Sequence, residues 1–167
     1  MARWSTVIPT WTTGSGVADT TDFATGNHHS IQGGSSTQRG EMREIFLSGQ
    51  AAASAPQYAV FGRNSQVATG SLTAPRLAAI DPATAALAAP PLPFTHSATN
   101  KSQRSATLGM LLALGFNAFG GIVRWVNGPD EIISYLGNTA SFGELSLSFF
   151  TGNTSAAVQS GIVFETL

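Results

Sequence analysis

The sequence predicts an all-β protein: an antiparallel β-sandwich or jelly-roll-like domain with a long irregular N-terminal arm and at most one short helix. Two observations favour this fold. From residue 107 to residue 167, short apolar runs alternate with Gly, Asn and Pro turns, as is typical of strands joined by hairpins. The preceding part of the chain is dominated by Gly, Ser, Thr, Ala and Pro, and its apolar bursts are too short to close separate cores. No repeat of fixed period is present, which argues against a propeller or a solenoid.

The N-terminal segment is predicted to be an extended arm over residues 1–40, followed by the β-sandwich domain over residues 41–167. We expect the arm to bind a neighbouring subunit, because large apolar side chains supply most of the energy at interface centres. The candidate partner-binding residues are Trp4, Val7, Ile8 and Trp11. The alternative is that this segment forms a first strand packed on the chain's own sheet.

Strands are expected where apolar runs are bounded by Gly, Pro or Asn. Residues 145–149 alternate strictly between an apolar residue and Ser, as in a strand that buries one face. Residues 127–130, Asn-Gly-Pro-Asp, are a strong turn signal, because Asn and Gly accept a positive φ and Pro is rigid. The predicted strands cover residues 44–47, 57–61, 107–114, 121–126, 131–136, 145–150 and 158–165.

An Ala/Pro-rich insertion is predicted within the domain at about residues 73–105. It holds the one expected helix, with Asp81 as N-cap and Pro82 at the first helical position. This helix would cover residues 83–89 and end at the two prolines that follow. The alternative for the end of the stretch is an extended segment of polyproline character over residues 89–94.

The charge content indicates a protein that associates with other subunits. Charged residues make up 10% of the chain and the formal net charge is −1, whereas globular proteins average about a quarter charged residues. A near-zero net charge promotes association, so we expect neighbouring subunits to cover much of the surface. The alternative is a monomer that is merely rich in Ser and Thr.

Other properties of the sequence narrow the class of protein. Lys and Arg are not clustered as nucleic-acid binding requires. The chain has no cysteine, so packing and partners rather than disulfides are expected to hold its loops. The first residues lack the basic start and apolar run of a signal peptide, and the longest apolar stretch, residues 108–119, is broken by Gly and Asn. We therefore expect neither signal-directed export nor a bilayer span.

The sequence predicts no metal site and no cofactor. His28 and His29 would point to opposite sides of an extended chain, which favours an exposed polar loop or an intersubunit hydrogen-bond site over metal ligation. Either role could make assembly mildly pH-sensitive near the histidine pKa. Residues 14–16 and 33–35 are Gly-rich but lack the strand, helix and Lys-Ser/Thr pattern of a phosphate-binding loop.

We expect the protein not to be an enzyme. No Gly-x-Ser-x-Gly motif of a serine hydrolase is present. The acidic residues could include a carboxylate pair of the glycosidase type, but charge balancing at interfaces explains them more simply. Those carboxylates are Glu41, Glu44, Asp130, Glu131, Glu144 and Glu165. Several aromatic residues could form a platform for sugar stacking, but their strand spacing favours core or interface packing. They are Trp125, Tyr135, Phe142, Phe149 and Phe150.

Two stretches, together with the Gly/Thr/Ser/Ala-rich arm, carry a resemblance to a known group of proteins. They are residues 119–126, Phe-Gly-Gly-Ile-Val-Arg-Trp-Val, and residues 140–167, which begin Ala-Ser-Phe-Gly-Glu-Leu-Ser-Leu. In style the chain resembles the decoration, or cement, proteins of tailed-phage capsids. The resemblance implies a homotrimer of β-domains on the outer surface of the virion, where it binds the major capsid protein and bridges neighbouring capsomers.

Two other functions remain open, because β-sandwiches serve many roles. A receptor- or glycan-binding module of a virion fibre or spike would expose Trp125 or Tyr135 on its loops. A self-assembling shell or tube subunit would form closed particles or tubes when purified alone.

Overall fold

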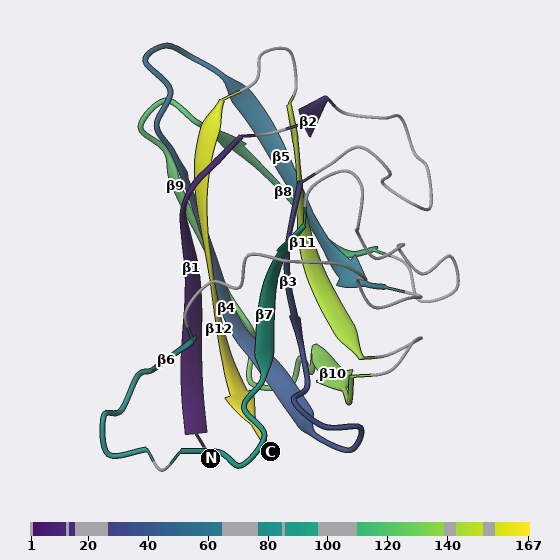
Figure 1. Cartoon of the computed structure of the whole chain (residues 1–167). Helices are drawn as coiled ribbons and strands as arrows, with labels where there is room; N and C mark the ends of the chain where they lie inside the picture. The colour runs from purple at the N-terminus through teal and green to yellow at the C-terminus, as the bar shows by residue number, and fades with distance from the viewer. Residues whose placement is uncertain are drawn as a thin grey trace.

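The chain folds into two β-sheets that face each other (Figure 1). The computed structural model describes residues 2–12, 14–15, 27–64, 77–84, 86–96, 110–138, 143–151 and 156–167. Within these residues every regular element is a strand, and the strands pair antiparallel except for one short parallel pair. The predicted all-β antiparallel fold is confirmed.

The last strand of the chain lies in the middle of the first sheet. The order of this sheet is β10 (Ser134–Leu136), β4 (Arg39–Gly49), β12 (Ala157–Thr166), β1 (Ala2–Thr12) and β6 (Leu77–Ala79). β9 (Ile122–Val126) pairs with the C-terminal half of β4, on the same side of β4 as β10. Ala2 pairs with Thr166, so the two marked ends of the chain lie together at one end of the sandwich (Figure 1).

The second sheet is centred on β11, which is the strand with the strict apolar–Ser alternation. The order of this sheet is β7 (Leu92–His96), β3 (Asn27–Gln32), β11 (Glu144–Thr151), β5 (Pro56–Arg63) and β8 (Met110–Asn117), with β2 (Gly14–Ser15) parallel to the end of β11. Alternation along β11 directs Leu145, Leu147 and Phe149 into the core, where all three are fully buried.

The core fills the space between the two sheets. On the first sheet, β12 contributes Ile162 and Phe164 to it, and both are fully buried. Burial of each such side chain stabilises the fold by about 1.5–3 kcal/mol. A hydrogen bond between two side chains also crosses the core: His29 Nδ1 on β3 lies 3.0 Å from Ser160 Oγ on β12, and both residues are fully buried. Because these residues belong to different sheets, the contact helps to fix how the sheets are aligned.

β4 departs from strict alternation at a β-bulge. Its register with β12 shifts so that Val163 pairs with Glu44 but Phe164 pairs with Met42, which leaves Arg43 as the extra residue. Met42 is fully buried, whereas Arg43 and Glu44 are only partly buried. The bulge therefore brings two adjacent charged residues to the outer face of the sheet.

A glycine–tyrosine pair closes one end of the core. Tyr135 on β10 lies opposite Gly40 on β4, and its ring also meets Phe164 edge-on, with the ring centroids 6.3 Å apart. A Cβ atom at Gly40 would lie 2.2 Å from the Tyr135 ring, so this position has room only for glycine. Burial raises the pKa of the Tyr135 hydroxyl well above its usual value, because the charged phenolate would lose its hydration.

The predicted helix over residues 83–89 is wrong for the described part of that stretch. Asp81 caps a single turn instead: its Oδ1 accepts a hydrogen bond from Ala83 N at 2.9 Å. Further along, the carbonyl oxygen of Ala89 accepts a hydrogen bond from Gln38 Nε2 at 2.8 Å, which ties this stretch to the loop before β4. A helix of two turns has little stability of its own, so these tertiary contacts decide the conformation.

All seven predicted strands are present among the described residues with shifted bounds, as β4, β5 and β8 to β12. Residues 2–12, whose sequence is compatible with an arm or with a first strand, form β1, which pairs with β12 and, at residues 4–6, with β6. The described parts of the insertion at about 73–105 supply β6 and β7, which are edge strands of the two sheets. Residues 16–26 of the predicted arm lie outside the described residues.

Replacement of Gly40 by Ala is expected to destabilise the fold by about 1–3 kcal/mol, because the added methyl group overlaps the buried Tyr135 ring. The matched control is Gly115→Ala on β8, where the added methyl group meets nothing within 4 Å and little change is expected. Urea unfolding monitored by tryptophan fluorescence measures both variants. Equal stabilities for the two variants would contradict the close packing of Tyr135 on Gly40.

Candidate functional site

Large apolar side chains are exposed along the side of the first sheet that β9 and β10 form. On β9, Ile122 is 79% exposed and Val126 is more than half exposed. Three more apolar residues are over half exposed: one in the turn before β9, one in the connection to β10 and one at the end of β10. We call these five residues the apolar edge: Phe119, Ile122, Val126, Ile132 and Leu136. They follow β4 from Ser48, which lies opposite Ile122, to Arg39, which lies opposite Leu136. Exposed apolar side chains along a strand edge can contribute to an interaction site.

The backbone of β9 adds to this surface. β9 pairs with β4 from Ile122 opposite Ser48 to Val126 opposite Glu44, and no described strand pairs with its other side. An edge of this kind can accept a strand from another chain. Arg124, between the two exposed apolar residues, forms an ion pair with Glu44 at 2.6 Å. A charge at the centre of an edge strand disfavours indiscriminate pairing, so a specific partner is favoured.

Asn127 holds the connection between β9 and β10 against β4. Its backbone N–H donates to the Arg43 carbonyl oxygen at 2.8 Å, and its side-chain Nδ2 donates to the carbonyl oxygens of Met42 and Glu131. The Met42 N–H in turn donates to the Ile133 carbonyl oxygen at 2.9 Å. These bonds fix the connection, which carries Ile132 of the apolar edge, at the bulge of β4.

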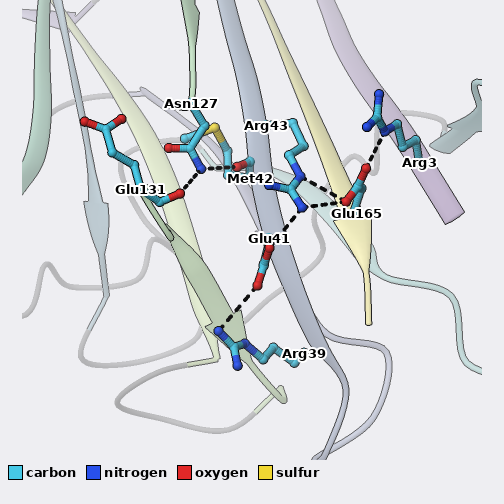
Figure 2. Close-up of polar contacts among 8 residues, drawn as sticks. All are labelled: Arg3, Arg39, Glu41, Met42, Arg43, Asn127, Glu131 and Glu165. Carbon is cyan, nitrogen blue, oxygen red and sulfur yellow. Dashed lines mark hydrogen bonds and ion pairs between the residues drawn. The ribbon is translucent and has the colours of Figure 1, made fainter. Parts of the chain in front are cut away.

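Charged residues on β1, β12 and β4 form a chain of ion pairs next to this connection (Figure 2). Glu165 on β12 binds both Arg3 on β1 and Arg43 on β4, with Arg43 Nη2 at 2.6 Å. Arg43 also contacts Glu41 at 3.0 Å. Glu41 in turn contacts Arg39 at 3.4 Å. The network therefore links three neighbouring strands across the outer face of the first sheet.

The protonation of Glu165 follows from opposing effects. Its side chain is only 5% exposed, and this burial by itself opposes ionisation. The hydrogen bonds and positive charges of Arg3 and Arg43 outweigh the burial, so the pKa of Glu165 lies below its ordinary value. A general acid of the glycosidase type needs a raised pKa, so this arrangement fits cohesion between strands better than proton transfer.

Another carboxylate, Glu144, lies buried at the start of β11. Asn64, directly after β5, donates from Nδ2 to Glu144 Oε1 at 2.8 Å and accepts at Oδ1 a bond from Ser146 Oγ at 2.9 Å. The Asn64 N–H also donates to the Glu144 carbonyl oxygen at 3.1 Å. All three residues are buried, and their bonds fasten the end of β5 to β11.

The histidine pair does not lie in an exposed loop, so that prediction was wrong. His28 and His29 belong to β3, which pairs with β11 on one side and β7 on the other, and His29 is fully buried. Pairing on both sides overrides the polar character of the segment, because it satisfies the backbone and turns alternate residues inward. Among the described residues, no group of three His, Asp or Glu side chains is placed to hold a metal ion.

The structure places the other predicted residues as follows. Tyr135 and Phe149 are buried in the core, and Trp125 is partly buried against it, which confirms core packing for these three aromatics. Phe142 and the side chain of Phe150 lie outside the described residues. The predicted partner-binding residues lie on β1, opposite β12, and their side chains also lie outside the description: Trp4, Val7, Ile8 and Trp11.

No family model, curated protein or solved structure matches this chain. In the described part of the chain there is no helix that is long and apolar enough to cross a membrane. Any functional conclusion therefore depends on the surfaces described above.

Sequence reasoning did not single out the apolar edge. Ile122 and Val126 look like ordinary residues of a half-buried strand, with Val123 and Trp125 between them equally apolar. Only Arg124 marks the exposed face of β9. That single charge is a weak signal, since which face of a strand is covered depends on the neighbouring elements.

Replacement of Glu165 by Gln is expected to lower the free energy of unfolding at pH 7 by about 1–3 kcal/mol, because Arg3 and Arg43 lose a shared, mostly buried carboxylate. The folded-state pKa of Glu165 is depressed. The stabilisation is therefore present above the unfolded pKa of about 4.3 and is lost as the pH falls through the folded pKa.

Urea unfolding of both proteins between pH 7 and pH 2 tests this dependence. The stability difference between the wild type and Glu165→Gln should shrink toward acid pH. Glu44→Gln, in the exposed pair with Arg124, is the matched control and should change stability little. A difference that stays constant down to pH 2 would contradict the role of the ionised carboxylate.

Proposed function

We propose that this protein is a structural virion component that binds the outer surface of a viral capsid as a decoration protein and bridges neighbouring capsomers. The observation that carries the proposal is the apolar edge on β9 and β10, where large apolar side chains lie beside a strand edge without a described partner. Such a surface is suited to binding another protein.

The character of the rest of the chain supports a binding role. With 10% charged residues and a net charge of −1, electrostatic repulsion between copies is weak. The ion pairs of Glu41, Glu44 and Glu165 are made within the chain, so these carboxylates hold strands together. A sandwich held in this way can repeat the same modest contact many times on a symmetric shell, which multiplies the overall affinity.

We infer that the protein forms a homotrimer and that the major capsid protein is its partner. The apolar edge would then serve as the contact between copies or with the shell. The backbone of residues 4–6 on β1 is already paired on both sides, with β12 and with β6. A contribution of Trp4, Val7, Ile8 and Trp11 to partner binding stays a prediction, and at residues 4–6 it would have to use side chains rather than strand addition.

The two other functions are less well supported by the geometry. A glycan-binding role through Tyr135 has little support, because this ring is 1% exposed, and Trp125 packs partly against the core. A shell or tube subunit could use the same apolar edge. Formation of large closed particles by the purified chain would favour that function over decoration.

The double variant Ile122→Ser/Val126→Ser tests the apolar edge. The wild type is expected to be a trimer of about 52 kDa, three times the chain mass of 17.3 kDa, in size exclusion with light scattering at two concentrations. The variant is expected to shift to lower mass or to lose binding to empty capsids of the virus that encodes the chain, measured by co-sedimentation.

The matched control is Ile80→Ser, which replaces an exposed isoleucine next to β6, on the opposite side of the same sheet. This control should keep both the mass and the capsid binding of the wild type. A wild type that stays monomeric and binds no capsid would overturn the proposal. If Ile80→Ser lost as much mass or capsid binding as the double variant, the apolar edge would not be the binding surface.

A further inference from the structure

Arg63 occupies an unusual position beside β10, at the end of the core that Tyr135 closes. It ends β5 and lies opposite Leu145 of β11, whose side chain is fully buried in the core. Directly opposite residues of an antiparallel pair project to the same face, so Arg63 projects between the two sheets. There its Nη2 donates to the Ser134 carbonyl oxygen of β10 at 3.1 Å.

The guanidinium of Arg63 has no carboxylate partner among the described residues. Its one hydrogen bond there is to the Ser134 carbonyl oxygen, which is neutral. By contrast, Arg3, Arg43 and Arg124 each contact a glutamate directly. Desolvation by burial lowers the pKa of Arg63, and no carboxylate among the described residues pairs with it to offset this effect. A partly buried cation with only a neutral partner is incompletely compensated, and an anion would supply the missing charge.

A second arginine, Arg39 on β4, lines a pocket together with Arg63. The pocket has a volume of about 300 Å³ and is also lined by Ser134 and Leu136. Arg39 contacts Glu41 at 3.4 Å, the longest of the ion pairs among the described residues, and Glu41 is also shared with Arg43. Because a guanidinium carries five N–H donors, both Arg39 and Arg63 keep donors free for another acceptor.

We propose that the pocket between Arg39 and Arg63 is an oxyanion-binding site that takes a carboxylate or a phosphate group. Two guanidiniums can each direct a pair of N–H donors toward the oxygens of such a group, which is the geometry that arginine uses for these anions. The volume is at the lower end of the range for small-ligand sites, so the pocket fits a small group rather than a large cofactor. The site does not depend on the decoration role.

Titration of the full-length protein with sodium phosphate, and separately with sodium acetate, tests the site. Sodium chloride holds the ionic strength constant, and the arginine Nε–Hε signals are followed by NMR. We expect saturable shifts of the Arg63 and Arg39 signals. Binding of acetate would identify a carboxylate site, and binding of phosphate alone would identify a phosphate site.

Arg63→Gln is expected to weaken anion binding about tenfold or more, because it removes charge-assisted hydrogen bonds. Arg39→Gln changes a more exposed residue and gives a second variant if Arg63→Gln fails to fold. Arg3→Gln on β1 is the matched control, which removes the same charge outside the pocket and should leave the affinity unchanged. Signals that respond no more to phosphate or acetate than to chloride would overturn the proposal. So would an equal loss of affinity in the Arg3→Gln control.

Discussion

The structure depends on the position of β12 at the centre of the first sheet. This last strand is hydrogen-bonded to β1 on one side and to β4 on the other, so the first and last strands and β4 are joined in one layer. One face of β12 supplies Ile162 and Phe164 to the core, and on the other face Glu165 binds arginines from both neighbouring strands. Removal of β12 would leave both neighbouring strands unpaired along that edge.

The few charges of the chain are used in two different ways. On the outer face of the first sheet, Glu165 binds Arg3 and Arg43, so these charges largely neutralise each other and hold strands together. At the end of the sandwich, Arg63 has a neutral carbonyl as its described partner. In the arrangement on the outer face, the opposite charges are paired within the chain. The arrangement around Arg63 leaves a positive charge that an external oxyanion can neutralise.

β10 connects the two surfaces that we assign to binding. Leu136 belongs to the apolar edge and also lines the pocket of Arg39 and Arg63. A partner seated on the apolar edge would therefore lie next to a site for a negatively charged group. Apolar contact supplies most of the affinity in such an interface, while a charged pair at its border supplies specificity. The bonds of Asn127 hold the preceding connection in place against β4.

The fold class and seven strands could be predicted from the sequence alone, because alternation such as that of residues 145–149 is a local property that follows from burying one face. Tertiary structure decided the rest. β3 became a strand, despite its histidines, through pairing with β11 and β7, and the stretch after Asp81 lost its helix to contacts with a distant loop. The apolar edge and the Arg39–Arg63 pocket were likewise not predictable, because exposure and charge compensation depend on which strands come to lie side by side.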